Sequence, residues 1–257
     1  MLNQTFVWGS ALALVVIVPM LIFSTLYGRA DSFQPTRFTV TIEGQGPDVI
    51  MIPGLASSAE VWRPAVEKLK ARYRVHLIQV SGFAGTPARA NASGPVLVPL
   101  RDEIVAYIRA NRLNRPAIVG HSLGGVLALM MADVAGDVTG KLVIVDALPF
   151  FGMLMGPTAT VESVTPSAAQ MRDRIKAMTA ADFAAGQART MMTLAKSKGA
   201  ATDAATKASQ TSDREVVAQV MYEDFITDMR PRLASISTPA LVLYAFDASM
   251  GMPQAAV

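Results

Sequence analysis

Gly120-His121-Ser122-Leu123-Gly124 is a Gly-x-Ser-x-Gly pentapeptide that lies between two apolar segments of the chain. Residues 116–119 (PAIV) predict a short buried strand, and residues 125–132 (GVLALMMA) predict the buried helix that follows it. A turn between such a strand and helix holds its central serine exposed at the carboxyl end of a sheet. The glycines on either side leave room where a Cβ would block the crossing of the backbone. The segment therefore predicts a strained nucleophile elbow with Ser122 as the nucleophile.

Apolar runs on both sides of this turn predict a mostly parallel sheet with helices on both faces. We expect strands at residues 38–42, 48–52, 73–80, 116–119, 142–145 and 239–244, and an amphipathic helix at residues 100–113. The first two strands, joined by Gly44-Gln45-Gly46, are expected to form a hairpin. Strands that alternate with helices indicate an α/β fold.

A long helical segment interrupts this alternation. Residues 150–235 are helical by pattern and predict a cap inserted into an α/β core made of residues 31–149 and 236–257. Ser212 with Glu215 is expected to start one of the cap helices. Methionines are spread through the cap, and methionine fits irregular apolar surfaces. The cap is therefore interpreted as a lid over a pocket for an apolar substrate, although the same methionines also suit an ordinary core.

Residues 1–30 are predicted to be a membrane anchor or a signal peptide. No residue from Met1 to Tyr27 is charged, and the mostly apolar run from Phe6 to Tyr27 is long enough to span a bilayer. Gly28-Arg29-Ala30 fits a cleavage site, whereas the long apolar run and the missing positive start favour an uncleaved anchor. Both interpretations predict a protein that is membrane-attached or exported to the periplasmic or extracellular side. The arginines that follow the apolar run leave the orientation of the segment in the membrane open.

The composition argues against several classes of protein. The 23 Lys and Arg residues against 20 Asp and Glu give a net charge of +3 without a basic run, so no nucleic-acid partner is expected. The absence of cysteine excludes disulfides, thiolate metal sites and a cysteine nucleophile. His76 and His121 are the two histidines of the chain and form no ligand cluster in the sequence, so we expect no metal and no cofactor.

Five segments together resemble the α/β-hydrolase superfamily, in particular its esterase, C–C hydrolase and haloperoxidase-like branch. They are residues 52–55 (IPGL), 81–85 (SGFAG), 120–125 (GHSLGG), 145–147 (VDA) and 243–247 (LYAFD). The resemblance covers about residues 38–150 and 230–257. It implies an α/β-hydrolase fold with a helical cap after the sixth strand. In this family a serine attacks an acyl carbon, a histidine takes its proton, an acid orients the histidine, and two backbone N–H groups bind the oxyanion.

The resemblance implies a role for each matching residue. Ser122 matches the nucleophile, and the N–H groups of Leu55 and Leu123 match the oxyanion hole. Asp247, after the last predicted strand, matches the acid, with Asp146 after the preceding strand as the alternative. The implied function is a serine hydrolase that acts on an ester or related acyl substrate through an acyl-enzyme. A C–C bond hydrolase and an inactive ligand- or partner-binding protein are the alternatives.

The general base of the family has no match in this sequence. His121 adjoins Ser122, where the two side chains should diverge, so we expect it to pack beside the turn. His76 lies inside a predicted strand, well before its carboxyl end, and is expected to be structural. The family's histidine follows the acid after a further helix and strand, whereas ten residues follow Asp247 here. We therefore expect a sequence truncated before the last strand and helix, with activity impaired by the loss of the base.

Overall fold

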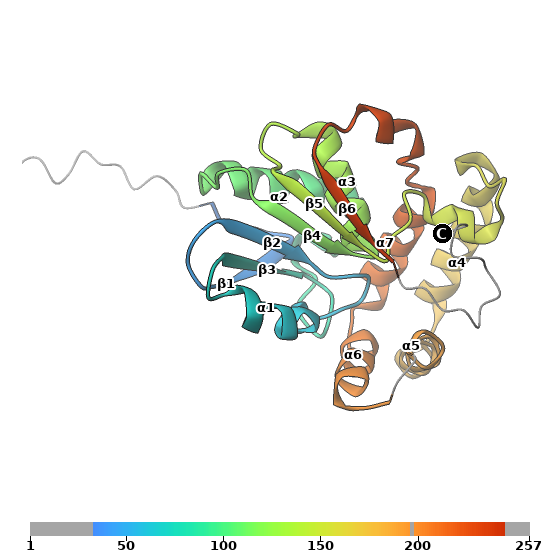
Figure 1. Ribbon diagram of the computed structural model, residues 1–257. Coiled ribbons are helices and arrows are strands. Elements are labelled where there is room, and N and C mark those ends of the chain that lie inside the picture. The colour runs from blue at the N-terminus through green and yellow to red at the C-terminus, as the bar shows by residue number, and fades with distance from the viewer. Residues whose placement is uncertain (1–32, 196–197, 245–257) are drawn as a thin grey trace, which may run out of the picture. The chain divides into compact units, whose positions relative to one another are not determined.

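A six-stranded sheet forms the centre of the part of the chain that the computed structural model describes, residues 33–195 and 198–244 (Figure 1). Its strands are β1 (Phe38–Glu43), β2 (Asp48–Ile52), β3 (Arg74–Val80), β4 (Ala117–His121), β5 (Lys141–Val145) and β6 (Ala240–Leu243). They lie in the order β1-β3-β2-β4-β5-β6, and all neighbours are parallel except β1 and β3. The predicted mostly parallel sheet is therefore confirmed.

The predicted hairpin of the first two strands is wrong, because β3 lies between β1 and β2. His76 on β3 is level with Ile42 on β1 and with Ile50 on β2. β2 and β3 are buried along most of their lengths, whereas β1 has several exposed positions. A strand that is apolar on both faces belongs inside a covered sheet, and a strand with a polar face tolerates an edge. Burial therefore explains why β1 is the outer strand.

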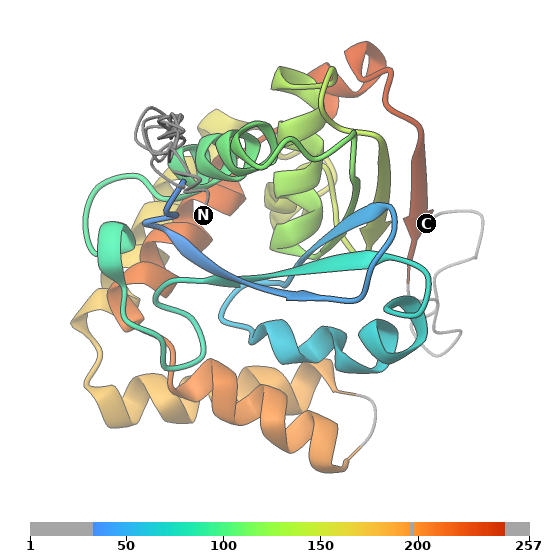
Figure 2. The same cartoon turned by 90° about the vertical axis from the view of Figure 1, so that its left-hand side faces the viewer.

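Helices cover both faces of the sheet (Figure 2). The helices are α1 (Arg63–Leu69), α2 (Leu97–Ala110), α3 (Leu123–Val134), α4 (Val161–Ala177), α5 (Ala180–Leu194), α6 (Ala200–Gln210) and α7 (Arg214–Ile226). Short 3₁₀ helices are η1 (Ala59–Trp62), η2 (Arg89–Asn91), η3 (Phe151–Met155) and η4 (Arg230–Ser235). Helix α2 begins three residues before the predicted start at Leu100. One face packs on α1 through Val66, and the other packs on α2 and α3.

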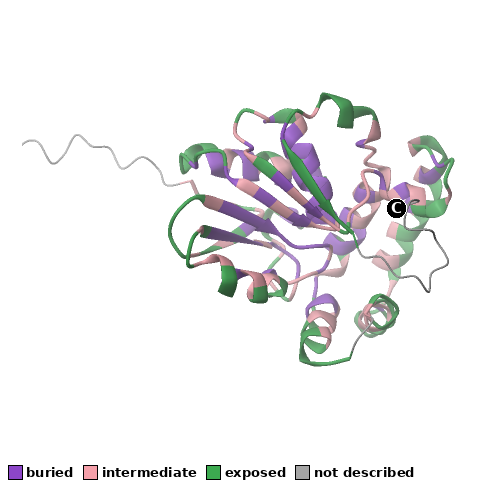
Figure 3. Cartoon of the chain, viewed as in Figure 1, coloured by how far each residue is buried: buried purple, intermediate pink, exposed green. Residues whose placement is uncertain are grey.

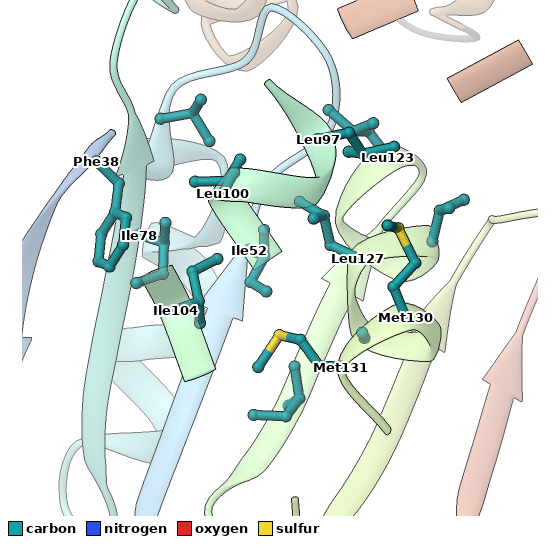
Figure 4. Close-up of a cluster of buried hydrophobic side chains, with 14 of the residues drawn as sticks. Phe38, Ile52, Ile78, Leu97, Leu100, Ile104, Leu123, Leu127, Met130 and Met131 are labelled. Carbon is teal, nitrogen blue, oxygen red and sulfur yellow. The ribbon is translucent and has the colours of Figure 1, made fainter. Parts of the chain in front are cut away.

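The larger core lies between the sheet and helices α2 and α3 (Figure 4). Alternate side chains of a strand point to opposite faces, so Ile50 and Ile52 join this core while Met51 joins the smaller core under α1. Figure 4 shows Ile52 with Leu100 of α2 and Leu127 of α3, all of which are buried. This core supports the start of α3, where the nucleophile elbow lies.

Helices α4 to α7 form the cap between β5 and β6, after the fifth strand of the described residues. Helix α4 packs against α7, and α5 packs against α6. Much of α5 and α6 is exposed (Figure 3). Ser212 does not cap α7 as predicted; the Asp213 carboxylate does so instead, accepting the N–H groups of Glu215 and Val216. The hydroxyl of Ser212 is engaged elsewhere, as described below.

Two predictions concern residues outside the described part of the chain. The anchor or signal peptide at residues 1–30 lies there, and so does the proposed acid Asp247. Among residues 33–195 and 198–244, no helix has the length and apolar character needed to cross a bilayer.

Candidate active site

Ser122 occupies the turn between β4 and α3 in a strained backbone conformation. Its φ of 50° and ψ of −120° lie where residues other than glycine are rare, at a cost of about 1–3 kcal/mol. The Ser122 N–H donates to the Val145 carbonyl at 2.9 Å, and the Ser122 carbonyl accepts the N–H of Gly125 at 2.7 Å. Hydrogen bonds to β5 and to the first turn of α3 therefore hold the strained residue in place.

The glycines around Ser122 are required by their surroundings. A Cβ on Gly120 would lie 2.0 Å from the Gly124 carbonyl oxygen, and one on Gly124 would lie 2.3 Å from the Ile52 carbonyl oxygen. A Cβ on Gly125 would lie 2.6 Å from the Cβ of Ala147. These separations are far below van der Waals contact, so the expected steric need for small residues is confirmed.

The loop after β2 lies against Ser122. A Cβ on Gly54 would lie 3.4 Å from the Cβ of Ser122, so Leu55 follows a residue in direct contact with the elbow. Among the described residues, the N–H groups of Leu55 and Leu123 have no hydrogen-bond acceptor. Two unengaged amides beside a nucleophile are what an oxyanion hole needs.

Gln79 on β3 fixes this loop, and the sequence pattern gave no reason to single it out. Its Oε1 accepts the N–H of Ala59 at 2.8 Å, and its Nε2 lies 3.4 Å from the Ser57 carbonyl. The same amide nitrogen lies 3.2 Å from the Val80 carbonyl and 3.4 Å from that of Phe83. One side chain thus links the loop after β2 to the loop after β3.

His76 is held away from Ser122 by two hydrogen bonds. Its Nδ1 is 2.7 Å from the hydroxyl oxygen of Tyr107, and its Nε2 is 2.9 Å from Oδ1 of Asp48. Burial lowers the pKa of His76, although the charge of Asp48 opposes this effect. Its position is level with residue 118 of β4, about 13 Å along the strands from Ser122. His76 cannot reach the nucleophile in this fold.

His121 packs beside the elbow. A Cβ on Gly54 would lie 3.0 Å from its Nδ1, so the imidazole ring rests against the loop after β2. Within the described residues, the ring forms no hydrogen bond to the hydroxyl of Ser122. Burial lowers the pKa of His121, and the charge of Asp146 acts in the opposite direction. Burial thus favours the uncharged form of the ring.

Asp146 lies at the same edge of the sheet as Ser122. It follows β5, whose last residue Val145 is level with His121, the residue before Ser122. Its φ of 48° is also in the left-handed region, and its N–H donates to the Leu243 carbonyl at 2.7 Å. The carboxylate is exposed. Of the two predicted acids, Asp146 is the one whose position the structure describes.

Asp224 on α7 is a buried carboxyl that the sequence pattern did not indicate. It is 4% exposed, and its Oδ1 has no hydrogen-bond partner among the described residues. Burial alone raises the pKa of Asp224 to about 7. The helical spacing of apolar residues in α7 could have shown that Asp224 faces inward, since Val217 and Val220 lie on the same side of the helix.

Comparison with known families gives a match over most of the chain. The model described as the alpha/beta hydrolase family matches residues 49–257. Among curated proteins, the pimeloyl-[acyl-carrier protein] methyl ester esterase of Aliivibrio salmonicida is 35% identical over 114 residues, 44% of this chain and 41% of that protein. The protein of the same name from Vibrio atlanticus is 34% identical over 116 residues, 45% of this chain and 42% of that protein. The matched region thus spans about two fifths of the length of these relatives.

Solved structures share the fold at lower sequence identity. The esterase from Exiguobacterium antarcticum superposes with a TM-score of 0.67 at 18% identity, covering 80% of this chain and 75% of that one. The enol-lactonase from Burkholderia xenovorans gives 0.61 at 16% identity, covering 80% and 76%. These likenesses show that the six-stranded sheet and its covering helices have the same arrangement as in those enzymes.

Proposed function

The chain belongs to the alpha/beta hydrolase family, and we propose that it is a serine hydrolase that cleaves esters of apolar acyl groups through an acyl-enzyme on Ser122. The observation that carries this proposal is the elbow itself. Ser122 is held at a φ of 50° beside the Gly54 loop, with the N–H groups of Leu55 and Leu123 next to it. A strained serine beside two unengaged amides suits attack on an acyl carbon.

In the proposed reaction the Ser122 oxygen attacks the acyl carbon and its proton leaves to a base. The N–H groups of Leu55 and Leu123 then bind the oxyanion of the tetrahedral intermediate. Removal of one such donor typically costs about 10² to 10³ in kcat, so these amides carry a large share of the rate. Loss of the alcohol gives the acyl-enzyme, which water hydrolyses in the second half of the cycle.

We propose that the 257-residue chain turns over slowly, because neither of its histidines serves Ser122. His76 is bound to Tyr107 and Asp48, and His121 rests against Gly54. A serine without a general base is a weak nucleophile. Asp247 remains the proposed acid and Asp146 its alternative.

The relatives supply the proposed substrate class. Two of them are named as methyl ester esterases that act on pimeloyl groups of an acyl-carrier protein. For this chain we propose a carboxylic ester of an apolar acyl group, with helices α4 to α7 as the lid over it. We also propose that residues 1–30 attach the protein to a membrane or direct its export.

Hydrolysis of p-nitrophenyl esters of increasing acyl length tests the proposal. We expect slow hydrolysis that Ser122→Ala abolishes, whereas Ser235→Ala, which changes an exposed serine of η4, leaves the rate unchanged. Imidazole in the buffer should raise the rate at least about tenfold, because it can act as the missing base. Hydrolysis that survives Ser122→Ala would show that the nucleophile is another group.

The alternatives give different results in the same assay. An inactive binding protein of this fold would show no Ser122-dependent hydrolysis even with imidazole. A C–C bond hydrolase would cleave a carbon–carbon bond of a diketone faster than it cleaves the esters.

A further inference from the structure

A hydroxyl of the cap reaches two loops at the carboxyl end of the sheet. Ser212 lies between α6 and α7 and is 6% exposed. Its Oγ accepts the N–H of Ala84 at 2.9 Å, in the loop after β3. The same oxygen lies 3.3 Å from the carbonyl oxygen of Ala56, in the loop after β2. Ser212 therefore joins the cap to the loop that carries Leu55.

Both loop residues that Ser212 contacts are strained. Ala56 has a φ of 54° and Ala84 a φ of 52°, in the left-handed region that costs about 1–2 kcal/mol for residues with a Cβ. Such conformations persist only where the surrounding structure constrains them. Ala84 is constrained by its hydrogen bond to the buried hydroxyl of Ser212, and Ala56 is constrained by the same hydroxyl when its proton is turned toward the Ala56 carbonyl.

The contacts around Ser212 hold this part of the cap against the loop after β3. The N–H of Asp213 donates to the Gly82 carbonyl at 2.6 Å. A Cβ on Gly82 would lie 2.8 Å from Cγ2 of Val216, so α7 packs closely on the loop after β3. Gln79 holds the loop after β2 from the sheet side, as described above. The oxyanion loop, residues 54–59, is thus held by Gln79 on one side and by Ser212 on the other.

The single proton of the Ser212 hydroxyl has two acceptors. The Ala208 carbonyl in α6 lies at 2.9 Å and the Ala56 carbonyl at 3.3 Å. A hydroxyl that is turned toward Ala208 completes the end of α6, and one that is turned toward Ala56 restrains the oxyanion loop. The hydroxyl therefore connects the end of a cap helix to the peptide that follows Leu55.

We propose that Ser212 is a positioning residue through which the cap holds the oxyanion loop, residues 54–59, so that the N–H of Leu55 binds the oxyanion beside Ser122. The hydroxyl touches no substrate and acts through Ala56. The catalytic half of this proposal rests on the proposed function. The structural half, the coupling of cap to loop, stands independently of it.

Ser209 provides a matched control. It is also 6% exposed and lies three residues before Ser212, but its hydroxyl bonds to Oε1 of Gln187 at 2.9 Å. That hydrogen bond joins α6 to α5 inside the cap. Removal of either hydroxyl deletes one buried hydrogen bond of the cap, and only the change at Ser212 also breaks a link to the oxyanion loop.

Hydrogen exchange and covalent labelling of the full chain test the two halves separately. Exchange of peptides that cover residues 53–61 is measured by mass spectrometry for the parent, Ser212→Ala, Ser212→Cys and Ser209→Ala. Loss of a buried hydrogen bond should raise exchange in this loop about tenfold in both Ser212 variants and not in Ser209→Ala. Labelling of Ser122 by a fluorophosphonate, with imidazole present, should slow about tenfold in the same two variants.

The outcomes separate the proposals. Equal loop exchange in Ser212→Ala and Ser209→Ala would overturn the coupling of cap to loop. Faster loop exchange with an unchanged labelling rate would also overturn the proposal, because Ser212 would then be merely structural. Faster loop exchange in both Ser212 variants, together with a parent chain whose Ser122 is never labelled, would support the coupling and refute the proposed function. The cysteine variant keeps the side-chain volume, so the comparison survives if the alanine variant folds poorly.

Discussion

The elbow around Ser122 follows β4, and strands β4 and β6 both pair with β5, yet the elbow and β6 are packed very differently. At the elbow, a Cβ added to Gly120 or to Gly124 would lie 2.0 to 2.3 Å from a backbone carbonyl oxygen. All four residues of β6 are exposed (Figure 3), with Leu241 at 55% and Val242 at 56%. Ser122 is thus held in a densely packed turn, whereas the strand before the predicted acid Asp247 is exposed.

The largest expected effect comes from adding a single methyl group to the elbow. Gly120→Ala places a Cβ 2.0 Å from the Gly124 carbonyl oxygen, where only backbone movement can relieve the clash. We expect the free energy of unfolding to fall by at least about 4 kcal/mol, or the protein not to fold. Urea unfolding followed by circular dichroism measures the change.

Gly186→Ala is the control for this substitution. It makes the same chemical change inside helix α5, where the nearest atom to the new Cβ is 3.8 Å away, on Arg189. Alanine is the better helix former, so this variant should be more stable by about 0.5–1 kcal/mol. Equal losses at both glycines would contradict the claim that the elbow is densely packed.

A second prediction concerns the carboxyl group of Asp224, whose charged form is disfavoured by burial. Asp224 has a pKa near 7 in the folded protein and 3.8 as its ordinary value, so the folded state holds a proton that the unfolded state releases. Stability should therefore fall as pH rises from about 4 through 7, by roughly 4 kcal/mol at most. Asp224→Asn should remove this loss and be more stable than the parent above pH 7. Unfolding free energies measured from pH 5 to pH 8 check the sign.

Asp203→Asn serves as the comparison for Asp224→Asn, because Asp203 is an exposed carboxylate of α6. Its unfolding free energy should stay within about 0.5 kcal/mol of that of the parent, because the substitution lies on the surface. If Asp224→Asn also stayed this close to the parent at every pH, the carboxyl would be solvated in solution and the cap more open than the structure shows.

A smaller effect distinguishes two neighbouring strands. Leu142 on β5 is 1% exposed and Leu241 on β6 is 55% exposed, although β5 and β6 are paired in register. Leu142→Ala should cost about 2–5 kcal/mol, whereas Leu241→Ala should cost less than about 1 kcal/mol. Thermal unfolding of the two variants measures the difference. A large loss for Leu241→Ala would show that β6 is covered in solution.

The exposed apolar face of β6 also predicts association. A strand edge with Leu241, Val242 and Leu243 exposed favours pairing with other chains. Leu241→Lys should lower the aggregated fraction seen by light scattering and change the unfolding free energy by no more than about 0.5 kcal/mol. No change in aggregation would place the association surface elsewhere.

Much of the fold could be predicted because the relevant signals are local. Each of the six predicted strand segments is a strand of the sheet, and the elbow glycines meet the close contacts that their spacing implied. The hairpin of β1 and β2 could not be excluded from sequence, because adjacency in the chain favours pairing and only burial shows that β3 separates them. Ser212 was mistaken for a helix cap because Asp213 beside it is also a residue type that commonly caps helices.

The parts of the site that depend on backbone geometry could be predicted from the sequence. Ser122 follows from the glycine spacing of the elbow, the loop at Leu55 follows from the resemblance to the α/β-hydrolase superfamily, and the structure brings Gly54 of that loop next to Ser122. The roles of Gln79 and Ser212 were missed because they depend on partners far away in the chain. No short pattern encodes such contacts.

The central claim is that Ser122 is the nucleophile, and the site of covalent modification tests it most directly. The full chain is treated with a fluorophosphonate in the presence of imidazole, digested, and analysed by mass spectrometry. A single adduct on the peptide that contains Ser122, absent from Ser122→Ala, is the predicted result. An adduct on another residue, or none at a concentration that labels a known serine esterase fully, would contradict the account.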